Sequence, residues 1–319
     1  MKRRKILIDT DTGSDDALSI AMALREPLFD VVAITTVAGN VPLETATENA
    51  LMTIDYAERD KPPVYMGCSK PLFRELLTAD SVHGKDGMGD LGIFTKSKRK
   101  PETEHAVDAI IRYADMGDVE FHTIGPLTNI AVAIMQNPEA MRKIPKITMM
   151  GGAIFRGNTG HLAEFNFWQD AEAADIVFNF GIPITTITIE ACATPDTRIL
   201  EEDMLMLKNT GSRLAAFCVD CNSTMAENVF RNSGERYFVT ADPTATAVMA
   251  RPDLIKKSVT SYTRFDIDGE YTYGMTVNDL RKTDSIYISK DTVLKPHNCT
   301  IVYEVDGAGF KEYLFSLII

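Results

Sequence analysis

The stretch Ile6-Leu7-Ile8-Asp9-Thr10-Asp11-Thr12-Gly13-Ser14-Asp15-Asp16-Ala17 decides how the rest of this chain is interpreted. Its apolar start predicts a buried β-strand, its acidic middle predicts a turn, and residues 17–24 predict a helix. Four carboxylates gathered at the end of a buried strand repel one another unless a cation neutralises them or some of them stay protonated. The sequence therefore predicts a cluster of acidic groups that favours a bound positive charge.

The ligands in this stretch are all oxygen atoms, because it contains neither cysteine nor histidine. Such a ligand set suits a hard divalent cation, Ca²⁺ or Mg²⁺. Helix capping is the simpler alternative, with Ser14 as the N-cap and Asp15 and Asp16 in a first turn where the helix dipole favours negative charge. Capping explains that pair but not Asp9 and Asp11, so a metal site is the better interpretation.

The composition of the 319-residue chain limits its partners. It has 33 basic and 45 acidic side chains and a net charge of −12, which argues against nucleic acid and acidic membrane surfaces as partners. The first apolar run ends at Asp9 and is too short for a signal peptide or a spanning helix. Five scattered cysteines favour reduced thiols over a disulfide framework, and the C-x-x-C pair Cys218 and Cys221 has no second pair to complete a zinc site. We expect a cytoplasmic protein.

Strands and helices alternate along the first two thirds of the chain. Strands are predicted at residues 31–37, 119–124, 146–150 and 183–189, and a helix at residues 42–58. This alternation predicts an α/β, Rossmann-like fold with a mostly parallel sheet flanked by helices. Ligands of such sheets bind beyond the carboxyl ends of the strands, which places Asp9, Asp11, Asn40 and Ile124 around one crevice.

Two irregular stretches are candidates for binding loops. Residues 67–100 are glycine-rich, and a loop of this length in a compact domain is often a lid or binding loop, with a disordered excursion as the alternative. Residues 152–169 mix polar and aromatic groups as small-molecule sites do. The region 218–237 offers further aromatic and basic side chains that could close a pocket.

The C-terminal third predicts additional helices and short strands. Helical structure is expected over residues 201–232 and after Asp242, with Pro243 at the first helical position. Strands are expected at residues 259–265, 271–273, 285–289 and 298–305, with a hairpin turn at 268–269 and a closing helix at 310–319. Neither a repeat nor a linker marks a boundary, so we expect residues 1–319 to form a single domain.

Seven motifs, in order along nearly the whole chain, resemble those of the nucleoside hydrolase family, the inosine/uridine-preferring ribohydrolases. They are DTDTGSDD at residues 9–16, HGKDG at 83–87, GPLTN at 125–129, GN at 157–158, EFN at 164–166, DAEAA at 170–174 and DP at 242–243.

This resemblance implies a Ca²⁺ ion bound by three carboxylates and one backbone carbonyl, those of Asp11, Asp16, Asp242 and Ile124. It further implies that Asp11 is the general base, which takes a proton from a Ca²⁺-activated water that attacks the anomeric carbon. Asp9 would support its neighbours. Asp242 could also serve as the N-cap of the helix that follows it.

The resemblance also implies a set of side chains that contact the ribose: Asp15, Asn40, Asn158, Glu164 and Asn166. Amides and carboxylates pair with hydroxyl groups, and a site built to pair a hydroxyl rejects analogues that lack it. We therefore expect deoxyribose to be a poor substrate. Taken alone, Asn40 is equally well explained as a turn residue.

The chain departs from the family pattern beside Asp242. Many relatives have a histidine directly before the Asp-Pro pair, where it can protonate the departing base, but here the residue is Ala241. The remaining candidates for contacts to the base are His83, which matches a base-proximal histidine of relatives, His161 and Trp168. Trp168 could stack on a base or belong to the core.

We therefore expect an enzyme of nucleoside metabolism and salvage that hydrolyses the N-glycosidic bond of ribonucleosides, and a homo-oligomer, dimer or tetramer, as relatives usually are. One alternative is a haloacid-dehalogenase-like phosphatase, in which the first Asp is the nucleophile and Mg²⁺ assists. The EFN motif at 164–166 is a ribose-type set and argues against it. The other alternative is a catalytically weak protein that binds a ribosyl ligand on the same scaffold, which Ala241 makes conceivable.

Overall fold

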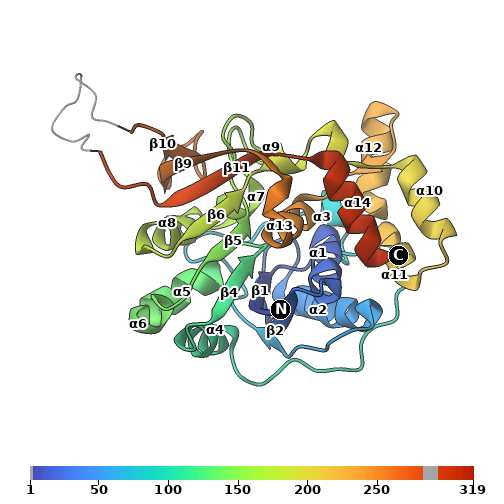
Figure 1. The fold of residues 1–319 in the computed structure, drawn as a ribbon, viewed down its shortest axis with the longest axis horizontal. Coiled ribbons are helices and arrows are strands. Elements are labelled where there is room, and N and C mark those ends of the chain that lie inside the picture. The colour runs from blue at the N-terminus through green and yellow to red at the C-terminus, as the bar shows by residue number, and fades with distance from the viewer. Residues whose placement is uncertain (1–2, 283–293) are drawn as a thin grey trace.

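The computed structural model describes residues 3–282 and 294–319, and within them the chain is built on a nine-stranded sheet (Figure 1). In spatial order the strands are β10 (Thr276–Asp279), β9 (Ile255–Phe265), β11 (Cys299–Val305), β6 (Ile184–Ile187), β5 (Ile147–Met150), β4 (Val119–Thr123), β1 (Arg4–Thr10), β2 (Phe29–Thr36) and β3 (Val64–Met66). Neighbours from β3 to β11 are parallel, whereas β9 is antiparallel to β11 and β10 to β9. The predicted Rossmann-like α/β fold is confirmed.

The position of β1 in the sheet determines where a ligand can bind. After β1 the chain builds β2 and β3 on one side and then returns to place β4 on the other. Such a change of direction opens a crevice at the carboxyl ends of the two strands on either side of it. The acidic turn that follows β1 and Ile124 after β4 meet there, and the Ile124 N–H donates to the Asp9 carbonyl at 2.8 Å.

Helices cover both faces of the sheet because successive side chains of β1 point in opposite directions. Leu7 belongs to the core under α4 (Ala106–Asp115), α5 (Thr128–Gln136), α6 (Pro138–Met141) and α8 (Ala171–Phe180). Ile6 and Ile8 belong to the core under α1 (Ser14–Arg25), α2 (Leu43–Ala57) and α13 (Ala241–Ala250). An outer layer of α10 (Glu201–Asn209), α11 (Arg213–Asp220) and α14 (Gly307–Ile318) packs on α1.

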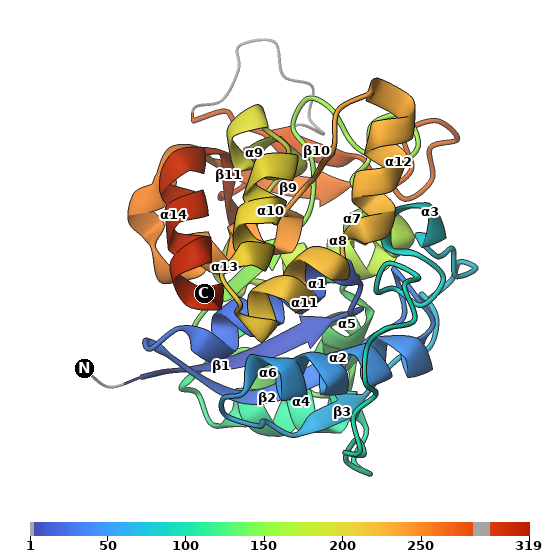
Figure 2. The ribbon, with the colours of Figure 1, turned by 90° about the vertical axis from the view of Figure 1, so that its right-hand side faces the viewer.

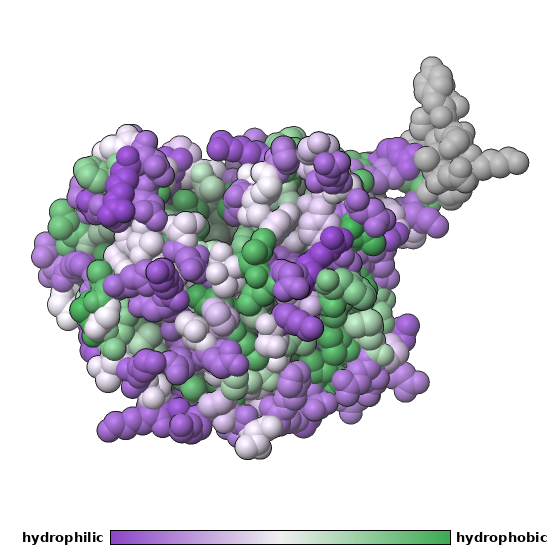
Figure 3. All heavy atoms as spheres, turned by 180° about the vertical axis from the view of Figure 1, so that it is seen from behind, coloured by the Kyte–Doolittle hydropathy of each residue, from purple (hydrophilic) through white to green (hydrophobic). Residues whose placement is uncertain are grey.

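Short elements surround the carboxyl edge of the sheet. They are α3 (Asp80–His83), α7 (Phe165–Gln169), α9 (Ile189–Cys192), α12 (Ser223–Ser233), two 3₁₀ turns (Pro195–Thr197 and Pro252–Leu254), and the paired strands β7 (Ile199–Leu200) and β8 (Tyr237–Phe238). Helix α12 packs against α3, and both lie on the same side of the molecule (Figure 2). From behind, hydrophilic side chains are spread over the surface with hydrophobic patches between them (Figure 3). None of the helices in the described ranges is long and apolar enough to span a bilayer.

Two predicted helix starts are wrong by one or two residues. Gly13, not Ser14, is the N-cap of α1, and Ser14 begins the helix. Helix α13 starts at Ala241 after the N-cap Thr240, so Pro243 is its third residue and Asp242 is not its cap. In both helices the acidic side chains therefore lie within the first turn, where free backbone N–H groups favour negative charge.

Other predictions for loops and strands also need correction. Residues 165–169 form the helix α7 inside a stretch expected to be irregular. The helical structure expected over residues 201–232 is present as three consecutive helices, α10, α11 and α12. Residues 271–273 form a turn, and the partner of β9 is β10, so Asp268-Gly269 lies in a longer connection than a tight hairpin. The strand predicted at 285–289 lies outside the described residues.

A buried polar chain joins the two helices that carry the acidic residues to the sheet. His122 on β4 has its Nδ1 3.0 Å from the Thr148 carbonyl and its Nε2 2.8 Å from Thr246 Oγ1, which lies 2.6 Å from Ser19 Oγ. Burial lowers the pKa of His122 to about 4, so the ring is neutral at physiological pH. The chain thus links α1 and α13 to β4 without adding charge.

Thr246→Val tests this link. The substitution removes the hydroxyl shared by His122 and Ser19 and leaves two buried polar groups unpaired, so we expect the free energy of unfolding to fall by about 1–3 kcal/mol in urea denaturation. Thr103→Val, at an exposed position, is the control and should change stability little. Equal stabilities of the two variants would contradict a stabilising role for the chain.

Candidate active site

Two helix starts bring three carboxylates together. Asp15 and Asp16 lie in the first turn of α1, and Asp242 lies in the first turn of α13, which packs against α1. Each of the three buried side chains offers an oxygen within 4.8 Å of the others. This is an oxygen-only donor set at the carboxyl edge of the sheet, formed by segments from opposite ends of the chain.

Asp11 lies beside this group and is held from one side. Its Oδ2 accepts a hydrogen bond of 2.6 Å from the Asn40 N–H, and its buried Oδ1 has no hydrogen-bond partner within the described part of the chain. Two glycines permit this close packing: a Cβ at Gly39 would lie 2.1 Å from Asp11 Oδ2, and one at Gly125 would lie 2.8 Å from Oδ1. Any larger residue at either position would displace the carboxylate.

Asp9 faces the sheet and the helix behind it. Its Oδ1 accepts hydrogen bonds from Thr35 Oγ1 at 2.5 Å and from Asn129 Nδ2 at 2.9 Å. Asn129, from the GPLTN motif, also donates to the Thr36 carbonyl at 3.0 Å. Asp9 therefore joins β1, β2 and α5 directly beneath the acidic turn, which is a supporting contact of the kind that the sequence led us to expect.

Burial and mutual repulsion dominate the electrostatics of the cluster. Burial, opposed by backbone hydrogen bonds, raises the pKa of Asp15 to about 6, and burial with the charge of Asp15 raises the pKa of Asp16 to about 6. Burial first, then neighbouring carboxylates, raises the pKa of Asp11 and of Asp242 well above the usual range. A divalent cation would relieve this repulsion, so the oxygen-only donors and the unpartnered Asp11 Oδ1 fit a hard metal ion.

The residues predicted to contact ribose line one cavity of about 620 Å³ next to the carboxylates. Asn40 reaches the cluster directly, donating from Nδ2 to Asp16 Oδ2 at 3.0 Å. Glu164 caps α7, with Oε1 accepting from the Asn166 N–H at 2.9 Å and Oε2 from the Gly152 N–H at 3.0 Å. Asn166 Nδ2 donates to the carbonyl of Ile124 at 3.3 Å, which links the EFN motif to the end of β4.

The loop at 67–100 supplies one wall of this cavity through His83 at the end of α3. The buried His83 Nδ1 lies 2.8 Å from Ser14 Oγ and 3.7 Å from Asp15 Oδ1. Burial lowers the pKa of His83 to about 4, so its ring is neutral near pH 7. The structure thus places part of this loop in the wall of the cavity.

Most predicted site residues are brought together, but not all of them. Those lining the cavity are Asp15, Asn40, His83, Ile124, Asn158, Glu164, Asn166 and Asp242. Asp11 and Asp16 lie fully buried beside it. Trp168 does not line the cavity, because the unpredicted helix α7 directs its ring toward Tyr273, with the ring centroids 6.4 Å apart. The interpretation of Trp168 as a contact to the base is therefore not supported.

Several cavity residues were not singled out from the sequence. They are Arg156, Glu190, Ala193, Arg198, Met225 and Val239. No motif marks them, and they come from loops and short elements that approach one another only in the folded chain. The region 218–237 had been expected to close the pocket, and Met225 and Tyr237 do so.

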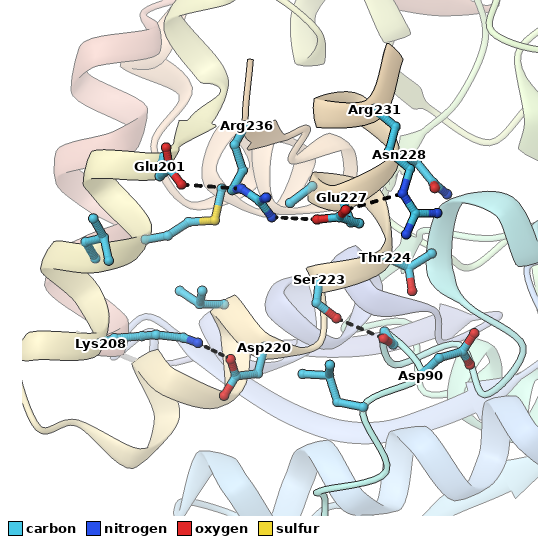
Figure 4. Close-up of a pocket in the computed structure, with 16 residues that line it drawn as sticks. Asp90, Glu201, Lys208, Asp220, Ser223, Thr224, Glu227, Asn228, Arg231 and Arg236 are labelled. Carbon is cyan, nitrogen blue, oxygen red and sulfur yellow. Dashed lines mark hydrogen bonds and ion pairs between the residues drawn. The ribbon is translucent and has the colours of Figure 1, made fainter. Parts of the chain in front are cut away.

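A second cavity, of about 600 Å³, lies between α10, α11 and α12 (Figure 4). Its charged side chains pair with one another: Arg236 with Glu201 at 3.3 Å and with Glu227 at 2.8 Å, Arg231 with Glu227 at 3.3 Å, and Lys208 with Asp220. The cationic side chains that line it are thus neutralised by neighbouring acids, and the cavity does not include the carboxylate cluster.

Comparison with known proteins identifies the family. A family model described as inosine-uridine preferring nucleoside hydrolase matches residues 6–312. The chain belongs to this family. The pyrimidine-specific ribonucleoside hydrolase RihB of Escherichia coli is 35% identical over 285 residues, covering 88% of each chain.

Solved structures agree with this identification. A plant nucleoside hydrolase superposes with a TM-score of 0.90 at 31% identity and covers 99% of this chain and 98% of its own. A purine-preferring ribonucleoside hydrolase from Gardnerella vaginalis superposes with a TM-score of 0.87 at 30% identity, with the same coverage of both chains. This nucleoside hydrolase is therefore an enzyme of the class that acts on N-glycosyl compounds, as the motifs indicated, and the phosphatase alternative loses its support.

Glu164→Gln tests the anchoring of the EFN motif. Both oxygens of the Glu164 carboxyl group accept backbone N–H groups, and they remain acceptors when the group is protonated. The amide of glutamine instead sets an NH₂ group against one of these donors, so we expect the free energy of unfolding in urea denaturation to fall by about 1–3 kcal/mol. Glu75→Gln, an exposed site, is the control and should have little effect.

The pH dependence of this difference has a defined sign. Burial raises the pKa of Glu164 from 4.5 to about 7, so between these values the unfolded chain has released a proton that the folded chain retains. The stability that protonated Glu164 contributes is complete below pH 4.5 and is lost as the pH rises through 7. The stability gap between wild type and Glu164→Gln should narrow over this range, and a widening gap would contradict the assignment.

Proposed function

We propose that this nucleoside hydrolase cleaves the N-glycosidic bond of ribonucleosides to free base and ribose. The observation that carries the proposal is the 620 Å³ cavity, in which a carboxylate cluster adjoins amide and carboxylate side chains suited to a polyol. The names of the relatives, one pyrimidine-specific and one purine-preferring, support ribonucleosides as the substrate class and leave the base open.

Asp11 is the general base of this proposal. Its Oδ1 has no partner in the described chain and can accept a proton from the water that adds to the anomeric carbon, while the Asn40 N–H holds Oδ2 in place. As the bond to the base breaks, positive charge develops on the ribose, and the carboxylates of Asp15 and Asp242 stabilise it.

Calcium is the proposed cofactor, held by Asp11, Asp16, Asp242 and the carbonyl of Ile124, with Asp15 within the same group of carboxylates. The chemistry of these donors supports a hard cation, because all of them are oxygens and no Lys or Arg in the described ranges is paired with the four carboxylates. When bound, such an ion would acidify a water in contact with it and neutralise the cluster.

The proposal extends to the cellular compartment, the domain organisation and the oligomeric state of the enzyme. All five cysteines are unpaired, which supports a reducing compartment, the cytoplasm, and a role in nucleoside salvage. We further propose that residues 1–319 act as a single domain and that the enzyme is a homo-oligomer.

Release of reducing sugar from a panel of purine and pyrimidine ribonucleosides tests the reaction. We expect activity that a chelator abolishes and added Ca²⁺ restores, and a loss of at least about 100-fold in kcat for Asp11→Asn, because the amide cannot take up the proton. Asp268→Asn, at the surface, is the control.

Two outcomes would overturn the proposed function. One is the absence of sugar release from every ribonucleoside of the panel. The other is phosphate release from nucleotides without any cleavage of nucleosides, which would restore the phosphatase alternative.

Recognition of the ribose hydroxyls gives a separate prediction. Uridine and inosine should exceed their 2′-deoxy analogues by at least about 100-fold in kcat/KM, because a missing hydroxyl leaves buried polar groups of the site unpaired. Comparing each nucleoside with its own deoxy analogue keeps the base constant. Equal kcat/KM values for a nucleoside and its deoxy analogue would show that the polar side chains of the cavity do not recognise the 2′-hydroxyl.

A further inference from the structure

Arg198 occupies a fixed position in the wall of the active-site cavity. It follows the 3₁₀ turn Pro195–Thr197 and precedes β7, which pairs with β8 so that Leu200 lies opposite Tyr237. The Arg198 Cζ lies 4.3 Å from the centre of the Tyr237 ring. Stacking of this kind holds a guanidinium plane in one orientation while its N–H edges remain free to donate.

The same region adjoins Ala241, the residue that cannot donate a proton to the base. Thr240 Oγ1 donates to the Thr197 carbonyl at 3.0 Å, and both threonines are fully buried. Arg198 and Ala241 are the next residues along these two tied segments, and both line the cavity. A basic side chain is therefore anchored next to the position where an acid for the leaving group is missing.

Arg198 also differs from the arginines of the second cavity. Its Nε is buried without a hydrogen-bond partner, and no acidic side chain of the described residues forms an ion pair with it. Arg236 is stacked similarly, 4.6 Å from the centre of Phe230, but is paired with two carboxylates (Figure 4). Because Arg198 lines the cavity and has no acidic partner, its guanidinium is available to an acceptor that arrives with a ligand.

We propose that Arg198 binds the departing nucleobase and stabilises the negative charge that forms on it. This inference rests on the proposed function. When the bond between C1′ and the base nitrogen breaks, its electron pair stays on the nitrogen, the water oxygen bonds to C1′, and the proton of the water passes to Asp11. The guanidinium keeps its own protons and donates hydrogen bonds to the anionic base, which takes a proton from solvent afterwards.

This role selects a class of base. An arginine that donates hydrogen bonds without transferring a proton favours bases that leave as stable anions, with ring carbonyls that share the charge. Uracil and hypoxanthine are of this type. Adenine, whose departure benefits from protonation, should be the poorer leaving group here.

The test compares leaving groups in the full-length enzyme. Arg198→Ala should lower kcat/KM for uridine and inosine by about 10- to 100-fold, the effect of losing hydrogen bonds to a charged group. The same variant should change kcat/KM for 4-nitrophenyl β-D-ribofuranoside less than 3-fold, because nitrophenolate leaves without assistance. Arg198→Lys keeps the charge and loses the planar fork, so its kcat/KM for the nucleosides should lie between those of the wild type and Arg198→Ala. If Arg198→Ala does not fold, Arg198→Lys takes its place in the comparison.

Arg213→Ala is the matched control, because Arg213 also stacks on a tyrosine, 4.3 Å from the centre of Tyr56, but does not line the cavity. Arg213→Ala should leave the ratio of kcat/KM for nucleosides to kcat/KM for the nitrophenyl riboside unchanged. The proposal is overturned if the Arg198 variants lose kcat/KM equally on nucleosides and on the nitrophenyl riboside, or lose it on neither substrate. A wild-type enzyme that cleaves neither substrate would instead overturn the proposed function.

Discussion

Buried carboxylates that repel one another at the carboxyl edge of the sheet are the constraint on which the rest of the site depends. Asp15, Asp16 and Asp242 each offer an oxygen within 4.8 Å of the others, Asp11 interacts with the charges of Asp15 and Asp16, and all four side chains are buried. Such an arrangement is unfavourable unless the surrounding backbone supplies positive partial charge and a cation completes the neutralisation. The first turns of α1 and α13 supply this partial charge, because backbone N–H groups from the starts of both helices hydrogen-bond to the Asp15 carboxylate.

The scaffold around the cluster resists its repulsion with neutral hydrogen bonds. The His122 chain fastens α1 and α13 to β4, and Asp9 with Asn129 fastens β1 to β2 and α5. A neutral histidine and an amide add no net charge to a site that already carries too many negative groups. The carboxylates can thus stay close together without a basic side chain among them, which leaves their oxygens available to a metal ion and a ribose.

The cavity carries side chains of both signs. The carboxylates of Asp15 and Asp242 line it, and so does Arg198, which forms no ion pair with an acidic side chain of the described residues. Positive charge that develops on a sugar and negative charge that develops on a base would each meet a side chain of opposite sign. The second cavity has a similar volume, but its cationic side chains, Lys208, Arg231 and Arg236, are each paired with a neighbouring acid.

Local features of the sequence predicted the fold and part of the site. Strand and helix periodicity depend on neighbouring residues and were enough to place Asp11 and Asn40 at one crevice. A family resemblance extended the predicted site to Glu164 and Asp242. What only the tertiary structure decided are the contacts between distant segments. It turned Trp168 away through an unpredicted helix and brought Arg198 beside Ala241. Such contacts arise from the packing of whole elements, which no local pattern of residues encodes.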